Sequence, residues 1–169
     1  MTFKNKTIGI LGGGQLGMMT AIAAKRLGYY TKLYCPKGDN PAEYNVNEYI
    51  DGDWDDFNKL EIFGSNVDVI TSEFENIPAK TLDNLSKITK VYPSSFCFSI
   101  AKYRNKEKEM ASKSGFLVPK WYKINSLEDL IKYSKVLNHN CILKTNSLGY
   151  DGKGQVNISS KINFKKIWE

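Results

Sequence analysis

The sequence contains little histidine and cysteine, and this scarcity excludes several kinds of site. Its single histidine, His139, lies between two asparagines in a predicted loop, which argues against a histidine-based catalytic triad. The three cysteines are widely spaced and form no Cys-x-x-Cys pair; they are Cys35, Cys97 and Cys141. We expect reduced, buried thiols of a cytoplasmic protein, and neither a disulfide framework nor a zinc site.

Long apolar runs are also lacking. No stretch approaches the roughly 20 apolar residues of a membrane span. The residues after Met1 lead directly into a strand pattern, so we expect no signal peptide. The sequence therefore predicts no membrane partner.

Charge is distributed unevenly along the 169 residues. Residues 1–96 carry 10 basic and 12 acidic side chains, whereas residues 97–169 carry 14 basic and 6 acidic ones. A basic second half suits a triphosphate, although lysines on solvated faces give the same balance. Because no basic stripe is interleaved with aromatic residues, we expect no nucleic-acid partner.

Apolar patterning predicts an α/β protein. In the first part, strands are expected at 7–11, 30–34, 67–72 and 90–92. Helices are expected between them at 15–27, 54–63 and 80–86, the second with Asp53 as its N-cap. This alternation is typical of a parallel sheet with right-handed crossovers.

The pattern changes after Pro93. A long charged helix is expected at 95–114, followed by strands at 121–124, 141–145 and 155–158 and by helices at 126–136 and from 161 onward. We therefore divide the chain into a Rossmann-like domain at 1–94, a linking helix at 95–115 and an α+β unit at 116–169. Because the last unit ends inside an element, we expect the chain to be the N-terminal portion of a longer protein.

The segment 144–155 carries the clearest functional signal. A strand ends at Lys144, a loop with three glycines follows, and a second short strand comes next. Such a hairpin can close over a polyphosphate, because glycine lets backbone N–H groups approach phosphate oxygens. Lys144 and Lys153 add positive charge. No Gly-Lys-Ser/Thr opens a helix here, so this is not a Walker sequence. An ordinary hairpin turn is the alternative.

A second glycine motif follows the first expected strand. Gly12-Gly13-Gly14-Gln15-Leu16-Gly17 matches G-x-G-x-x-G and leads into a helix whose N-terminus could bind an anion. A dinucleotide fold also predicts an acidic residue at the end of the second strand, where the sequence is Leu33-Tyr34-Cys35-Pro36-Lys37. A nicotinamide-dependent oxidoreductase is therefore only an alternative. The glycines, Gly17 above all, could instead serve strand–helix packing.

Two carboxylates follow the third expected strand, where ligands of open α/β sheets gather. They are Glu73 and Glu75 of the run Glu73-Phe74-Glu75-Asn76-Ile77-Pro78. A solvated loop with one capping acid is the alternative.

These motifs resemble those of the ATP-grasp carboxylate–amine ligases, and most of all the N5-carboxyaminoimidazole ribonucleotide synthase family of purine biosynthesis. The resemblance rests on the loop Gly149-Tyr150-Asp151-Gly152-Lys153-Gly154-Gln155, on the first glycine motif and on the run from Glu73 to Pro78. Arg104 and Lys108 also match the family, whereas Tyr103 stands where the family has aspartate.

The resemblance implies a Rossmann-like pre-ATP-grasp domain followed by the incomplete small α+β lobe of an ATP-grasp fold. It implies an ATP-dependent ligase, inactive as this portion alone, that carboxylates 5-aminoimidazole ribonucleotide with bicarbonate through carboxyphosphate. The implied cofactors are ATP and Mg²⁺, the latter with ligands beyond Glu169. The implied assembly is a cytoplasmic homodimer. Another ATP-grasp carboxylate–amine ligase and a regulatory protein that binds nucleotide without turnover remain alternatives.

The resemblance also assigns roles to residues. The expected catalytic residues are Tyr150, Asp151 and Lys153. The expected ATP-binding residues are Arg104, Lys144, Gly149, Tyr150, Asp151, Gly152, Lys153, Gly154 and Gln155. The expected contacts of the ribonucleotide are Gly14, Gln15, Leu16 and Glu73. No metal ligand is expected within the 169 residues.

Overall fold

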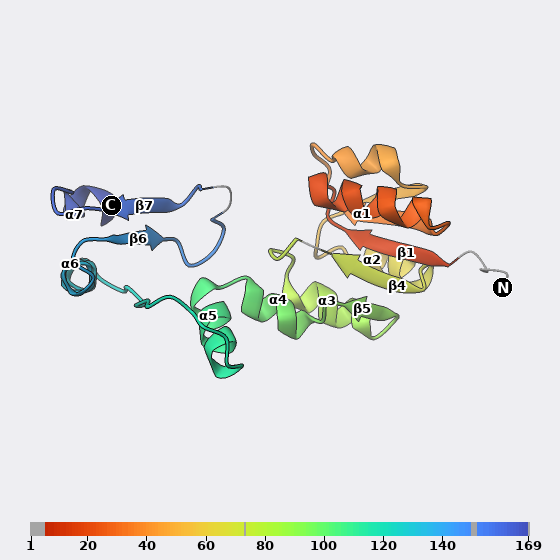
Figure 1. Cartoon of the computed structure of the whole chain (residues 1–169). Coiled ribbons are helices and arrows are strands. Elements are labelled where there is room, and N and C mark those ends of the chain that lie inside the picture. The colour runs from red at the N-terminus through yellow and green to blue at the C-terminus, as the bar shows by residue number, and fades with distance from the viewer. Residues whose placement is uncertain (1–5, 73, 150–151, 169) are drawn as a thin grey trace. The chain divides into compact units, whose positions relative to one another are not determined.

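The computed structural model describes residues 6–72, 74–149 and 152–168. The chain forms two compact units, Met1–Ser99 and Ile100–Glu169, each with its own sheet (Figure 1). In the described ranges, no helix combines the length and the apolar character that crossing a membrane requires.

The first unit contains a five-stranded parallel sheet in the order β3-β2-β1-β4-β5. Its strands are β1 (Thr7–Leu11), β2 (Tyr30–Cys35), β3 (Glu48–Asp51), β4 (Val69–Ser72) and β5 (Lys90–Tyr92). Four of them lie where the sequence predicts strands. The edge strand β3 is missed by the sequence reasoning, since its four residues are too few for a clear alternation.

Helices connect these strands, and a further helix follows β5. They are α1 (Gln15–Arg26), the 3₁₀ helix η1 (Pro41–Asn45), α2 (Phe57–Ser65), α3 (Ala79–Ser86) and α4 (Ser95–Ala101). The expected start of the second helix is wrong. The side chain of Asp56, not Asp53, caps α2 by accepting from the Lys59 N–H at 3.1 Å. The main-chain oxygen of Asp53 instead accepts from the buried Tyr34 hydroxyl at 2.7 Å.

Alternate residues of the strands enter two separate apolar clusters, as expected for a sheet covered on both faces. Leu11 and Tyr34 pack with side chains of α2 and α3. Ile10 and Leu33 pack instead with Ala21 of α1 and with η1. The sheet is thus a rigid base that fixes the loops at its carboxyl edge.

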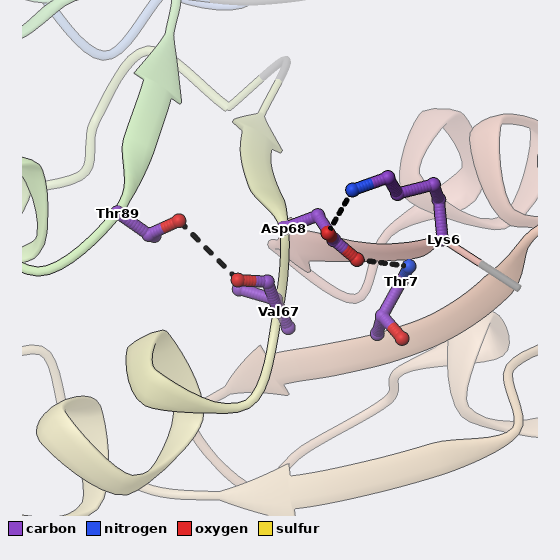
Figure 2. A network of polar contacts seen from close by, with 5 residues as sticks. All are labelled: Lys6, Thr7, Val67, Asp68 and Thr89. Atoms are coloured by element: carbon purple, nitrogen blue, oxygen red, sulfur yellow. Dashed lines mark hydrogen bonds and ion pairs between the residues drawn. The ribbon is translucent and has the colours of Figure 1, made fainter. Parts of the chain in front are cut away.

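The amino end of β4 is held to both neighbouring strands by polar contacts (Figure 2). The Asp68 carboxylate accepts from the Lys6 ammonium at 2.6 Å and from the Thr7 N–H at 2.8 Å. The Thr89 hydroxyl donates to the Val67 carbonyl at 3.3 Å. The Lys6 contact, followed by the Thr7 N–H, lowers the pKa of Asp68. Because the ion pair is exposed, it adds little to the free energy of unfolding.

The second unit contains an antiparallel strand pair and three helices. Its elements are α5 (Arg104–Lys113), α6 (Leu127–Val136), β6 (Cys141–Lys144), β7 (Gln155–Ile158) and α7 (Phe164–Trp168). The predicted single helix over 95–114 is wrong, because the chain is extended at Tyr103 and α5 begins anew at Arg104. The described segment 121–124 is irregular and not a strand. Its Tyr122 ring stacks on Tyr133 of α6 at 4.2 Å instead of belonging to a paired strand.

The expectation of three buried cysteines is only partly right. Cys35 is buried and Cys141 is half-buried, whereas Cys97 is exposed. Cys97 lies on α4, in which Phe98 is the buried residue. His139 follows α6 with a positive φ of 53°, and its ring centroid lies 6.0 Å from that of Phe164.

Candidate functional site

The segment 144–155 forms the predicted hairpin. Lys144 ends β6 and pairs with Gln155, the first residue of β7, so the two strands enclose a loop of residues 145–154. Tyr150 and Asp151 of this loop lie outside the described residues. Thr145 closes the base of the loop, because its N–H donates to the Gly154 carbonyl at 2.8 Å.

The loop glycines have two different structural reasons to be glycine. A Cβ on Gly149 would lie 2.8 Å from the Thr145 hydroxyl oxygen, and one on Gly154 would lie 2.6 Å from it. These two glycines therefore allow the two arms of the loop to come together at Thr145, Gly149 and Gly154, a place that we call the neck of the loop. Gly152 has a φ of +78° and no comparable crowding, so its backbone conformation is what requires glycine.

Arg104 lies at this neck. Its Nε donates to the Thr145 carbonyl at 3.2 Å, and its Nη2 donates to the Gly149 carbonyl at 2.7 Å. The sequence predicts Arg104 as an ATP contact. The structure brings it to the glycine-rich loop, where these two bonds use two of its five N–H donors.

Asn146 was missed by the sequence reasoning. Its main-chain oxygen accepts from the Arg104 N–H at 2.9 Å, and its side-chain Oδ1 accepts from the Asn105 N–H at 3.1 Å. It therefore takes the place of an N-cap for α5. No local sequence signal could identify this cap, because donor and acceptor are 41 residues apart.

An open hollow of about 1020 Å³ lies within the second unit. Its walls come from α5, the segment 119–124, α6, the two strands and α7. Apolar side chains such as Leu130, Leu143 and Val156 line it together with cationic ones, among them Arg104 and Lys144. An apolar surface beside clustered positive charge suits a ligand with an aromatic base and phosphates.

The first unit brings its two motifs to one edge of the sheet. β1 and β4 are neighbours, and Leu11 pairs with Ser72 at their carboxyl ends. The Ser72 hydroxyl donates to the Leu11 carbonyl at 2.7 Å and accepts from the Phe74 N–H at 3.1 Å. A Cβ on Gly12 would lie 3.3 Å from the Phe74 Cβ. The first glycine motif and the run after β4 are therefore in contact.

The start of α1 is open at this edge. Gly14 is the N-cap residue and makes no side-chain capping bond, and a Cβ added there would meet nothing within 4 Å. Gly14, Gln15 and Leu16 are all exposed. Free N–H groups at a helix N-terminus can receive an anion such as a phosphate. Glu73, expected at the same edge, lies outside the described residues.

The remaining glycines of this motif serve packing. A Cβ on Gly17 would lie 2.3 Å from the Gly12 carbonyl oxygen, which confirms the expected packing role of Gly17. A Cβ on Gly13 would lie 2.4 Å from the Asn40 side chain, which donates to the Pro36 carbonyl at 2.8 Å. Asn40 was also missed by the sequence reasoning, although its place in the run Gly38-Asp39-Asn40-Pro41 indicated a turn.

The described part of the chain offers no metal centre. Nowhere in it do three His, Cys, Asp or Glu side chains come together in a group that could hold a metal ion.

The second carboxylate of the run after β4, that of Glu75, accepts from the Asn76 side chain at 3.2 Å. This contact gives Glu75 a local structural role.

Comparison with known proteins identifies the family. The sequence model described as the ribonucleotide synthetase preATP-grasp domain matches residues 5–102, more than half of the chain. The chain belongs to the ribonucleotide synthetase preATP-grasp family. The model of the ATP-grasp domain matches residues 109–169 of this family member. Neither model is that of a nicotinamide-dependent oxidoreductase, and the predicted fold class is confirmed.

The curated relatives of this preATP-grasp family member include a ribonucleotide synthase and a purine synthesis protein. An N5-carboxyaminoimidazole ribonucleotide synthase of Brucella melitensis is 41% identical over 91% of the chain and 42% of that protein. The bifunctional purine synthesis protein purC/E of Dictyostelium discoideum is 36% identical over 96% of the chain and 16% of that protein. The chain thus spans less than half the length of each of these relatives.

A solved structure of an N5-carboxyaminoimidazole synthetase is similar to the chain in both fold and sequence. The N5-carboxyaminoimidazole synthetase of Staphylococcus aureus, crystallised with ADP, has a TM-score of 0.87 and 36% identity to the chain. The match covers 96% of the chain and 44% of the solved chain. The roles assigned to individual residues, and the division at residues 94 and 115, stay predictions.

Proposed function

We propose that the intact protein carboxylates 5-aminoimidazole ribonucleotide with bicarbonate at the expense of ATP, in purine biosynthesis. The product would be N5-carboxyaminoimidazole ribonucleotide. The observation that carries this proposal is the glycine-rich hairpin of the second unit, whose neck is held by Arg104 at the wall of a partly apolar, basic hollow. Membership of the preATP-grasp family and the names of the relatives support the choice of substrates.

ATP would bind in the hollow of the second unit. The apolar side chains of α6 and the two strands would face the adenine ring, while Lys144 at the end of β6 would meet the phosphates. The loop 149–155 would cover the phosphates with backbone N–H groups, and Lys153 would neutralise charge on the transferring group. Closure of such a loop keeps water from a labile acyl phosphate.

The chemistry needs two group transfers. In the first, a bicarbonate oxygen attacks the γ-phosphorus of ATP, so that ADP leaves and carboxyphosphate forms. In the second, the exocyclic amine of the ribonucleotide attacks the carboxyl carbon, the C–O bond breaks, phosphate leaves, and the amine loses a proton. Phosphoryl transfer depends mainly on positioning and charge neutralisation, which loop and lysines can provide. Tyr150 and Asp151 would orient or deprotonate the amine.

The ribonucleotide would bind at the carboxyl edge of the sheet in the first unit. Gly14, Gln15 and Leu16 are exposed there at the start of α1, where free N–H groups suit its phosphate or ribose oxygens. Glu73 would face its amine or ribose. This part of the proposal rests on the contact between the two motifs at Gly12 and Phe74.

Mg²⁺ would accompany the ATP phosphates, as hard cations do. We propose carboxylates beyond residue 169 as its ligands, because Mg²⁺ that is bound together with phosphates prefers oxygen donors. We further propose a cytoplasmic homodimer with neither nucleic acid nor membrane as a partner.

The proposal is tested by ADP release from the intact protein with ATP, Mg²⁺, bicarbonate and 5-aminoimidazole ribonucleotide, omitting one component at a time. ADP release should need all of them, and residues 1–169 alone should release none. A parallel titration with NADH should show no binding. Tight NADH binding without any effect of ATP would contradict the proposed function.

A further inference from the structure

Helix α5 does not cap its own N-terminus. Its N-cap residue, Tyr103, makes no side-chain capping bond, and tyrosine is not among the residues that commonly cap helices. Asn146 supplies two acceptors instead, its main-chain oxygen to the Arg104 N–H and its Oδ1 to the Asn105 N–H. One residue of the glycine-rich loop thus satisfies two of the four N–H groups that begin the helix.

The first turn of α5 also contacts the loop through the Arg104 side chain. Its bonds to the carbonyls of Thr145 and Gly149 join two points of the loop that are four residues apart. Hydrogen bonds from a charged donor are stronger than neutral ones. Four hydrogen bonds therefore connect the first turn of α5 to residues 145–149.

The neck of the loop leaves little room for these arms to move independently. The Thr145 N–H donates to the Gly154 carbonyl, and the Thr145 hydroxyl oxygen would lie 2.8 Å from a Cβ on Gly149 and 2.6 Å from one on Gly154. A displacement of Asn146 would therefore shift the start of α5, the Arg104 guanidinium and the neck together.

We propose that Asn146 is a positioning residue of the nucleotide site. By capping α5 it holds residues 145–149 in place before ATP arrives, so that less conformational freedom is lost when the loop meets the phosphates. Asn146 acts through Arg104 and the loop backbone, and its own amide need not touch ATP. The inference rests on the proposed function for the identity of the ligand.

The first test is the dissociation constant for ATP of the intact wild-type protein and two variants. Asn146→Ala removes the side-chain acceptor and should weaken ATP binding on the order of tenfold, the scale of a lost helix cap. Asn146→Asp keeps an acceptor and adds a charge that the helix N-terminus favours, so its affinity should stay within about threefold of wild type. Asn157→Ala, on the exposed face of β7, is the matched control and should bind as wild type does.

The variants also separate positioning from direct contact. If the Asn146 amide donated to a phosphate, the aspartate variant would repel the ligand and bind more weakly than the alanine variant. That order of affinities would overturn the proposal, as would wild-type affinity in Asn146→Ala.

Hydrogen exchange tests the cap without any ligand. Asn146→Ala removes the acceptor of the Asn105 N–H and keeps the main-chain acceptor of the Arg104 N–H. The Asn105 amide should therefore exchange on the order of tenfold faster in Asn146→Ala and at the wild-type rate in Asn157→Ala. Unchanged exchange in Asn146→Ala would overturn the cap. A wild-type protein that binds ATP but does not turn over would contradict the proposed function, while the affinity series would still decide the role of Asn146. A wild-type protein without ATP affinity would overturn both.

Discussion

The hydroxyl oxygen of Thr145 occupies the space that a Cβ on Gly154 would need, at a separation of 2.6 Å. Gly154 also has a φ of +67°, similar to the +78° of Gly152, which is not crowded. Substitution by alanine should therefore strain the backbone similarly at both glycines, whereas only at Gly154 would the added Cβ be crowded.

We predict that Gly154→Ala destabilises the second unit by about 1–3 kcal/mol more than Gly152→Ala, the usual cost of overpacking. Urea unfolding of residues 1–169 would measure the difference. In a Trp54→Phe background, the fluorescence comes only from Trp121 and Trp168 of the second unit. Equal losses of unfolding free energy in the two variants would contradict this prediction, because the neck would then widen without a cost in stability.

Lys144 is predicted to contact a phosphate or the adenine of ATP, and Lys153 is predicted to stabilise charge on the transferring phosphoryl group. Lys144→Ala and Lys153→Ala in the intact protein should each lower turnover on the order of 10²-fold or more, the usual scale for a lost transition-state charge contact. ADP release measures this loss. Lys161→Ala, outside the hairpin, is the control, and wild-type rates in both test variants would refute the assigned roles.

Within the first glycine motif, Gly17 should matter for packing and Gly14 for binding of the ribonucleotide. Gly17→Ala places a Cβ against the Gly12 carbonyl oxygen and should lower the free energy of unfolding of the first unit by about 1–3 kcal/mol. Gly14→Ala meets open space, so it should leave unfolding unchanged and raise the KM for 5-aminoimidazole ribonucleotide. In a background with Trp121→Phe and Trp168→Phe, the tryptophan fluorescence comes from Trp54 and reports unfolding of the first unit. A large loss of stability in Gly14→Ala would contradict this division.

The cysteines should differ in reactivity toward a thiol reagent. Burial raises the pKa of Cys35 to about 11, so its reactive thiolate forms only as the pH rises toward that value. Burial also raises the pKa of Cys141. At pH 8, the exposed Cys97 of the native chain should react first, and Cys97→Ser should abolish the fast phase. Modification of Cys35 as rapidly as Cys97 would contradict the buried position.

Sequence reasoning predicted the elements whose signals are local. The strands β1, β2 and β5 end just before Gly12, Pro36 and Pro93. Ser126 is the N-cap of α6, and its side chain accepts from the Asp129 N–H as expected. The hairpin around the glycine-rich loop was likewise predicted, because its strands are separated by a short, glycine-rich run.

The errors arise where distant residues decide the structure. The break before α5 depends on Asn146, which bonds to the helix start from 41 residues away. Tyr122 packs on Tyr133 of α6, a contact that the strand-like pattern of its neighbours does not indicate. For the same reason, the family resemblance names Arg104 as an expected ATP contact, whereas the sequence does not place its side chain at the neck of the loop.

The most direct test of the proposed chemistry follows the oxygen atoms of bicarbonate. The intact protein would turn over ATP and 5-aminoimidazole ribonucleotide with ¹⁸O-labelled bicarbonate, and the phosphate would be analysed by mass spectrometry. If bicarbonate attacks the γ-phosphorus and its C–O bond later breaks, each phosphate released carries one ¹⁸O. Phosphate without label, formed together with carboxylated product, would contradict a carboxyphosphate route.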